Sequence, residues 1–327
     1  MLQLFRKNMV FNNLLLIPYI LIVHSGKFFV NYGQIHLDHS WLTDQLILWS
    51  GLTDNAQFYV SLIILFVDAL LLNQFVNDHK LNPDGQLFAG LVLIILSGFH
   101  PVLSGLTGLL IGSMFYILAL RAVSNTYLMK NASLSIFNFG FYSGLATLFY
   151  TTYLWLVVLG IFGLIVFRGL SFRELMQLIS GLVCVAILLA MFLYVKQLSA
   201  IYFADQYASL FSPYPLAMKF GGSGLVSFVI VMILFIAALL QFSVFQIKTH
   251  IGAQKVYDFL FWACLISLFS VMFVKIDNIA PLLILIMPLS VLLAVILAKI
   301  RNLLLAETLH LFFALLALLF PPQTRPP

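Results

Sequence analysis

Charged side chains are scarce in this chain: Asp, Glu, Lys and Arg together make up only 8% of its 327 residues. Water-soluble domains carry about 25% charged residues, because their surfaces must be hydrated. The scarcity therefore excludes a large soluble domain. Hydrophobic residues make up 63% of the chain, and the mean hydropathy is +1.09. Since a transmembrane helix needs about 20 largely apolar residues, we expect an all-α, polytopic transmembrane helical bundle of about ten or eleven spans, forming one integral membrane domain over residues 1–327.

The chain also lacks the motifs of common enzymes and metal sites. Its two cysteines, Cys184 and Cys264, lie far apart in apolar runs, which favours a packing role over a disulfide or a metal site. No Walker motif, HExxH helix or nucleophile elbow occurs. The basic residues behind the net charge of +5 form no cluster, which argues against nucleic acid as a partner. No cofactor is evident from the sequence, and the expected partner is the lipid bilayer.

Apolar runs predict the position of each span. The run at Gln86–Phe99 is short for a full crossing, so a re-entrant pair of segments around His100-Pro101 is an alternative that would leave ten spans. The first run has a basic start but no signal-peptide cleavage site after it, so we expect it to stay in the membrane. The eleven runs are Phe11–Val23, Gln57–Phe75, Gln86–Phe99, Ser104–Leu120, Ser135–Tyr150, Tyr153–Phe167, Leu175–Val195, Gly224–Phe242, Phe259–Val274, Ile279–Ala298 and Leu303–Phe320.

The basic residues predict the orientation of the bundle. If eleven spans alternate from a cytoplasmic N-terminus, eleven of the 16 Lys and Arg residues fall on the cytoplasmic side. Cytoplasmic loops are enriched in Lys and Arg, so this N-in arrangement is favoured. It leaves short cytoplasmic loops and places two longer loops, residues 25–56 and 196–222, on the external face. The residues assigned to the cytoplasm are Arg6, Lys7, Lys80, Arg121, Lys130, Arg168, Arg173, Lys248, Lys255, Lys299 and Arg301.

The first external loop contains the sequence HLDHSWLTDQLILWSGLTDN. Its apolar residues recur at helical spacing, which predicts a short amphipathic helix at the membrane interface, with Trp41 and Trp49 at headgroup depth. Asp38 and Asp44 are the candidate catalytic residues, as a general base or as a metal ligand for a lipid-linked phosphate. Alternatively, the acids of this loop are hydrated and structural, with Asp54 capping the span that follows.

Ionisable residues inside the predicted spans are rare, and each is informative because a charge in the bilayer core is costly. Asp68 lies midway along the second span with Asn73 nearby, and we treat both as candidate substrate-binding residues. A hydrogen bond between helices is the structural alternative for Asp68. Glu307 and His310 share a face of the last span and are expected to pair. Small residues that we expect to permit close helix packing are Gly140, Gly144, Gly160, Gly163 and Gly169.

Two stretches carry a resemblance to a known family: LLNQFVNDHKLNPDGQLFAGLVLIILSGFHP (Leu71–Pro101) and SIFNFGFYSGLATLFYTTYLWLVVLGIFGLIVFRGLSFRELMQLISGL (Ser135–Leu182). They resemble a family of uncharacterised multi-spanning inner-membrane proteins of Bacteroidota, known as a domain of unknown function. The resemblance covers most of the chain and implies a multi-pass protein of a bacterial inner membrane, without an activity. It is most specific at Asn77, Leu81, Pro101, Phe137, Gly140, Leu145, Leu148 and Arg173.

The layout also resembles the C superfamily of membrane glycosyltransferases, which take sugars from polyprenyl-phosphate donors. These enzymes have a long first external loop with an acidic catalytic residue, and a second long external loop after the seventh span. Here the long external segments follow the first and seventh runs, although the adjacent acidic pair and the large external domain are missing. The resemblance implies an acid/base or metal-coordinating role for Asp38 or Asp44, with a divalent metal ion as the conceivable cofactor. It places Tyr202, Tyr207 and Lys219 of the second loop at the lipid-linked donor.

Three functional hypotheses follow from these features. The first is a lipid-linked sugar transferase or polymerase that acts in envelope glycan biogenesis at the outer face of the inner membrane. The second is a transporter or flippase that uses Asp68. The third is a non-catalytic membrane scaffold of an envelope assembly. The sequence identifies neither the substrate nor the oligomeric state.

Overall fold

A computed structural model describes residues 5, 10–26, 40–82, 87–99, 103, 105–199, 202, 222–241, 249–272, 281–300 and 302–319. Over this part of the chain every regular element is a helix, and each of the eleven apolar runs contains one, which confirms the all-α bundle. The helices are α2 (Val10–Leu14), α3 (Leu16–Val23), α4 (Trp41–Ser50), α5 (Asp54–Asp78), α6 (Phe88–Gly98), α7 (Gly108–Ser124), α8 (Ser133–Phe149), η4 (Thr151–Trp155), α9 (Leu156–Phe167), α10 (Phe172–Lys196), α12 (Gly222–Leu240), α14 (Ile251–Met272), α15 (Leu282–Lys299) and α16 (Leu303–Leu319).

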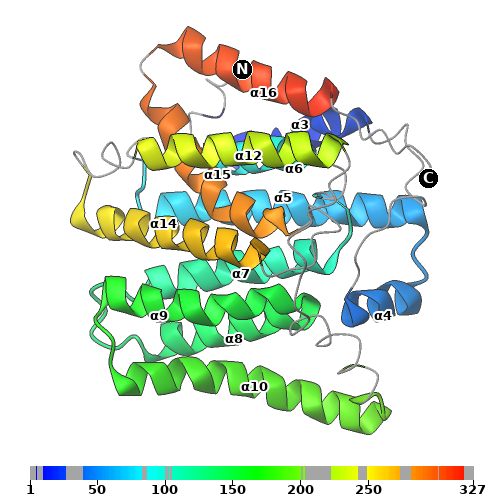
Figure 1. Ribbon diagram of the computed structural model, residues 1–327, viewed down its shortest axis with the longest axis vertical. Coiled ribbons are helices and arrows are strands. Elements are labelled where there is room, and N and C mark those ends of the chain that lie inside the picture. The colour runs from blue at the N-terminus through cyan, green and yellow to red at the C-terminus, as the bar shows by residue number, and fades with distance from the viewer. Residues whose placement is uncertain are drawn as a thin grey trace.

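The helices lie side by side with roughly aligned axes, so that the longest dimension of the molecule runs across them (Figure 1). α16 lies at one end of this row and α10 at the other, with α6 and α15 between them. Every residue of α6 is buried, and α15 is buried from Leu282 to Leu292. These two apolar helices pack against each other and form the centre of the core.

Four helices are long and apolar enough to cross a membrane: Asn55–Asp78, Phe172–Lys196, Ile251–Val271 and Leu282–Lys299. α10 exposes large apolar side chains along its outer face, among them Ile187 at 54% and Met191 at 63%. Such a face is stable against lipid and unfavourable against water. The chain is therefore a membrane protein, as its composition predicts.

α6 is the exception in length. Its 11 residues span about 16 Å, roughly half of the hydrocarbon core. His100 and Pro101, where a re-entrant turn is the alternative, lie outside the described residues.

Basic side chains gather at one end of the bundle, which we call the basic end. Arg121, near the end of α7, forms an ion pair with Asp78 at the end of α5, with 2.5 Å between Nη2 and Oδ2. Lys255, in the first turns of α14, donates to the carbonyl of Val166 near the end of α9 at 2.7 Å. Lys299, the last residue of α15, lies 6.0 Å from the ring centroid of Tyr257 on α14. These three contacts of basic residues join helix ends that the N-in arrangement assigns to the cytoplasm.

Arg168 closes the turn between α9 and α10 at the same end. Its Nε donates to Glu174 Oε1 at 2.6 Å, and Nη1 donates to the carbonyls of Thr126, at 3.3 Å, and Met129. Gly169 follows with a φ of +84° and open space around its Cβ position. It therefore ends α9 in a left-handed turn. The expectation that Gly169 permits close helix packing is wrong.

The glycines on α8 and α9 do permit close packing. A Cβ on Gly140 would lie 2.1 Å from the carbonyl oxygen of Leu178 on α10, and one on Gly160 would lie 2.2 Å from the Phe139 ring. A Cβ on Gly144 would likewise come too close to the Val185 side chain, and one on Gly163 to the Val123 side chain. The helices meet at backbone distance there, as small residues allow in membranes.

Candidate functional site

The end opposite the basic end is uneven, because α5 and α10 are longer than the helices between them. α5 and α10 have 25 residues each and span about 37 Å, whereas α7 and α8 have 17 each and span about 25 Å. The hydrogen bond from Ser113 to Asp68 shows which residues of α7 and α5 lie at the same height along the helix axes. α5 begins 14 residues before Asp68 and α7 begins five before Ser113, so α5 extends about 14 Å further.

α10 extends past α8 in the same way. Gly144 of α8 contacts Val185 of α10, and α8 ends five residues later, whereas α10 continues for eleven. The difference of six residues is about 9 Å. The two long helices therefore extend beyond the ends of α7 and α8.

α4 lies beyond these helix ends, at the same end of the bundle as the start of α5 (Figure 1). Its N-terminal residues Ser40 and Thr43 are buried, and their hydroxyl oxygens lie 2.9 Å apart. They contact the first residue of α7, Gly108, where a Cβ would lie 2.2 Å from the carbonyl oxygen of Phe149 and 2.7 Å from Ser40 Oγ. α4 reaches the helix ends below it because Gly108 has no side chain.

The two long loops meet at α4. The Trp41 ring packs edge-on against the Tyr202 ring at a centroid distance of 5.4 Å, and both side chains are buried with Leu193 of α10. At the other end of α4, Trp49 packs on Phe192 at 6.3 Å. We call Trp41, Leu193 and Tyr202 the aromatic cluster. It joins residues of the two segments predicted to share the external face.

A helix, α4, is present where the first loop is predicted to form one, and two details around it differ from the expectation. Trp49 is 57% exposed, as expected of an interfacial residue, but Trp41 is only 7% exposed and belongs to the aromatic cluster. Thr53, rather than Asp54, caps α5: its hydroxyl accepts from the amide of Ala56 at 3.4 Å. Asp44 lies in the first turn of α4 and is half-buried.

The remaining candidates of the two external loops fall outside the described residues. These are Asp38, Tyr207 and Lys219. Among the residues that are described, no three His, Cys, Asp or Glu side chains are grouped closely enough to hold a metal ion. The divalent ion implied by the glycosyltransferase resemblance therefore has no ligand set in the described part of the chain.

Asp68 is fully buried between α5 and α7. Ser113 Oγ donates to Asp68 Oδ2 at 2.5 Å, and Oδ1 has no hydrogen-bond partner among the described residues. Other residues with hydroxyl groups are buried in the same part of the bundle. The Tyr153 and Tyr116 rings lie 5.9 Å apart, and the Tyr116 hydroxyl lies 3.4 Å from Ser267 Oγ. The interhelical hydrogen bond expected as the structural role of Asp68 is present, and one carboxylate oxygen remains available.

Asn73 and His310 each use one polar atom for a contact between helices. Asn73 Oδ1 accepts from the amide of Gly90 on α6 at 2.8 Å, while its Nδ2 has no described partner. His310 Nε2 lies 2.9 Å from the Tyr19 hydroxyl on α3, and the two rings are stacked. The sequence indicated Glu307 as the neighbour of His310, but no local pattern could have revealed Tyr19, 291 residues away.

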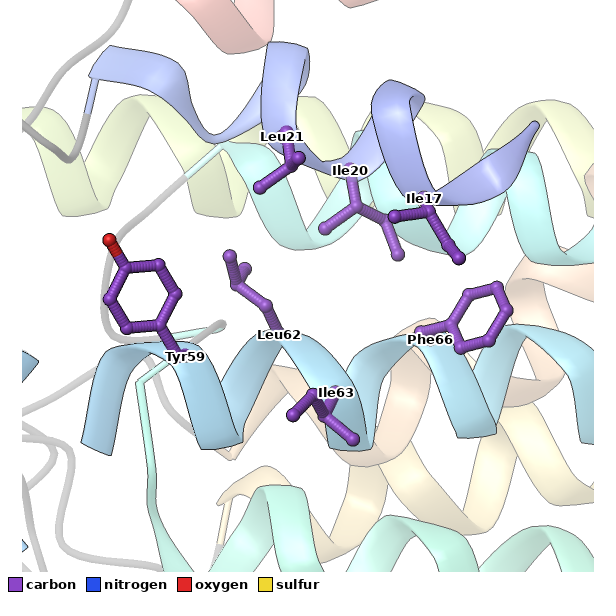
Figure 2. Close-up of a pocket in the computed structure, with 7 residues that line it drawn as sticks. All are labelled: Ile17, Ile20, Leu21, Tyr59, Leu62, Ile63 and Phe66. Carbon is purple, nitrogen blue, oxygen red and sulfur yellow. The ribbon is translucent and has the colours of Figure 1, made fainter. Parts of the chain in front are cut away.

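An apolar groove opens on the side of the bundle between α3 and the first half of α5. It has a volume of about 210 Å³. Ile17, Ile20 and Leu21 of α3 face Leu62 and Phe66 of α5 across it (Figure 2). Tyr59 lies at the end of the groove nearer the start of α5 (Figure 2). The Tyr59 end of the groove therefore lies at the end of the bundle where α5 begins.

Comparison with known proteins adds no relative to this picture. No family model, no curated protein sequence and no solved structure matches the chain.

Proposed function

We propose that the protein is a membrane-embedded enzyme that transfers or polymerises a sugar from a polyprenyl-phosphate carrier at the α4 end. The contact between Trp41 and Tyr202 is the observation that carries the proposal. It joins residues of the two long segments at one end of the bundle. A lipid-linked substrate would react at such an end, because its phosphate and sugar lie at the membrane surface while its chain stays in the hydrocarbon.

The apolar groove supports the same reading. Side chains of Ile17, Leu62 and their neighbours offer almost only carbon to the bilayer side of the bundle. A polyprenyl chain is a branched hydrocarbon, and lying in the groove would place its phosphate near the start of α5, at the α4 end of the bundle. Asp44, half-buried on α4, would act as the acid/base group or position the donor phosphate through a bound cation.

The test is a comparison of three carboxylates in cells whose envelope glycans depend on the protein. Asp38→Asn and Asp44→Asn each remove a candidate catalytic group, and we expect at least one of them to abolish the glycan while the protein accumulates normally in the membrane. Asp54→Asn is the matched control, because it makes the same change at the first residue of α5 and leaves the Thr53 cap intact. Normal glycans in both test variants would contradict the proposal and favour the scaffold hypothesis.

A proton- or cation-coupled transporter is the second candidate, favoured by Asp68. Its free Oδ1 and the neighbouring hydroxyls of Ser113, Tyr153 and Tyr116 could pass a proton or hold a cation. Asp68 has no exposed surface, so transport would require an alternative arrangement of α5 and α7. Purified protein in vesicles with an internal pH dye would show proton uptake that Asp68→Asn abolishes and Ser113→Ala reduces. Equal uptake in the variants and the wild type would contradict this function.

A further inference from the structure

A polar cleft opens at the basic end, between the end of α5, the end of α7 and the start of α14. Its volume is about 290 Å³. Polar side chains and backbone line it, in contrast to the apolar groove of Figure 2. The residues that carry the argument are His79, Lys80, Ser124, Tyr127, His250 and Gly252. This cleft is at the opposite end of the molecule from α4 and from the proposed sugar-transfer site.

Two polar groups in the cleft are buried and unsatisfied. Ser124 is 2% exposed, and its hydroxyl has no hydrogen-bond partner among the described residues. His79 Nε2 is buried and equally without a described partner. Buried polar atoms are nearly always paired, so an unpaired hydroxyl that lines a cleft points to a ligand that completes it.

The histidine is neutral when it meets such a ligand. His79 follows the last residue of α5 and lies beyond the membrane span. Burial lowers the pKa of His79 from its ordinary 6.5 to about 4; the nearby carboxylate of Asp78 opposes the shift and Arg121 adds to it. A neutral imidazole can donate one hydrogen bond from Nε2, so His79 can contribute a donor without a charge.

The start of α14 forms another part of the cleft wall. Gly252, in the first turn of this helix, lines the cleft. The cleft therefore lies at the N-terminus of a 22-residue helix, which carries a partial positive charge. A Cβ at Gly252 would lie 3.2 Å from the Tyr127 ring, so the absence of a side chain keeps this turn close to its neighbours.

The charges of the cleft favour an anion. Lys80 is exposed at its mouth with a φ of +49°. Asp78 also lines the cleft, but its carboxylate is paired with Arg121, which in turn donates to Gln74 at 3.1 Å. Among the described residues of the lining, Lys80 therefore supplies a positive charge that this ion pair does not balance.

We propose that this cleft binds a phosphate group, carried either by a small soluble compound or by the headgroup of an anionic lipid. Helix N-termini bind phosphate through their free amides, and a lysine adds the charge that the group requires. Ser124 and His79 would supply the specific hydrogen bonds from the inner wall. The proposal is independent of sugar transfer, since it concerns the other end of the bundle and other residues.

The experiment uses the full-length protein in nanodiscs and separates the two sources of phosphate. In phosphatidylcholine nanodiscs, titration with inorganic phosphate, followed by calorimetry, detects a site for soluble ligands. In nanodiscs with added phosphatidic acid, native mass spectrometry counts lipids that stay bound to the protein. Saturable, one-to-one binding in either arm is the expected result.

Variants assign the binding to the cleft. We expect Lys80→Gln to weaken it about tenfold, because charge-assisted hydrogen bonds to phosphate are strong, and Ser124→Ala to weaken it severalfold. Lys130→Gln is the control, since it removes an exposed lysine outside the cleft lining. Each variant should unfold at the same temperature as the wild type, which would show that its fold is intact. Absence of saturable binding in both arms, or an equal loss in Lys130→Gln, would overturn the proposal.

Discussion

The two ends of the bundle are built on different principles. At the basic end the helices finish together, and contacts between charged groups and backbone carbonyls connect neighbouring helix ends, as in Arg168 with Thr126 and Lys255 with Val166. At the α4 end the helices finish at different levels, and aromatic packing between Trp41 and Tyr202 joins α4 to the second long segment. Charged groups thus connect helices at one end of this protein, whereas aromatic and apolar packing connects them at the other.

The largest effect should come from removing the centre of the aromatic cluster. Trp41→Ala leaves a cavity between α4, Leu193 and Tyr202, and we expect a loss of about 3–5 kcal/mol in the local stability of α4. Hydrogen exchange of the α4 amides would measure it. Trp49→Ala is the matched control, because Trp49 is 57% exposed and its removal should cost far less. Equal exchange in both variants would show that α4 is not held by this cluster.

Acid should weaken the basic end before it affects α4. The unfolded chain binds a proton at His79 near pH 6.5, but burial lowers the pKa in the folded protein to about 4. The stabilising effect of the neutral histidine is thus fully present above pH 6.5 and is lost as the pH falls toward 4. The loss should reach at most about 3 kcal/mol.

Thermal unfolding between pH 7 and pH 4 measures this dependence. His79→Gln should make it shallower, because the variant lacks the buried histidine whose lowered pKa produces this part of the dependence. A wild-type protein with the same pH dependence as His79→Gln would mean that His79 is hydrated in solution.

Loss of one arginine should loosen the turn that closes the basic end. Arg168→Ala removes the pair with Glu174 and the hydrogen bonds to the carbonyls of Thr126 and Met129, which should cost about 2 kcal/mol. Arg173→Ala is the control for charge, because that side chain is exposed. Arg168→Ala should lower the unfolding temperature more than Arg173→Ala does. An equal shift would mean that Arg168 contributes to stability through its charge alone.

The smallest effect concerns the turn after α9. Gly169→Ala should cost about 1 kcal/mol, because φ is +84° there and a side chain strains the backbone even though the space is open. Gly169→Asn should cost less, since asparagine tolerates the left-handed region better. Thermal unfolding of the two variants tests this ranking. A variant Gly169→Ala as stable as wild type would show that the turn relaxes.

Much of the fold could be predicted from local patterns. Each of the apolar runs contains a helix, and α4 follows from the helical spacing of apolar residues between Trp41 and Leu52. Helix ends were harder to predict: Thr53 rather than Asp54 caps α5, and Gly169 forms a turn rather than a packing contact. A cap or a left-handed glycine depends on backbone angles at single residues, which composition and spacing do not determine.

The polar sites show the limit of sequence reasoning more clearly. Asp68 stood out because an acid within an apolar run is rare, and the structure adds its partner Ser113, 45 residues away. The cleft at the basic end was missed, since Ser124, His79 and Gly252 are unremarkable in their own segments. They become a candidate site because the ends of three helices bring these residues together around one cleft.

By itself, the sequence determined that this protein is helical, belongs in a membrane and carries its basic residues at alternate helix ends. Those properties depend on how much of each segment is apolar and on where single charges fall, both of which are local. Only the tertiary structure decided that α7 and α8 end short of α5 and α10, that Trp41 meets Tyr202, and that Ser124 lacks a partner. These features depend on the relative lengths and levels of helices far apart in the chain, and packing between helices sets those levels.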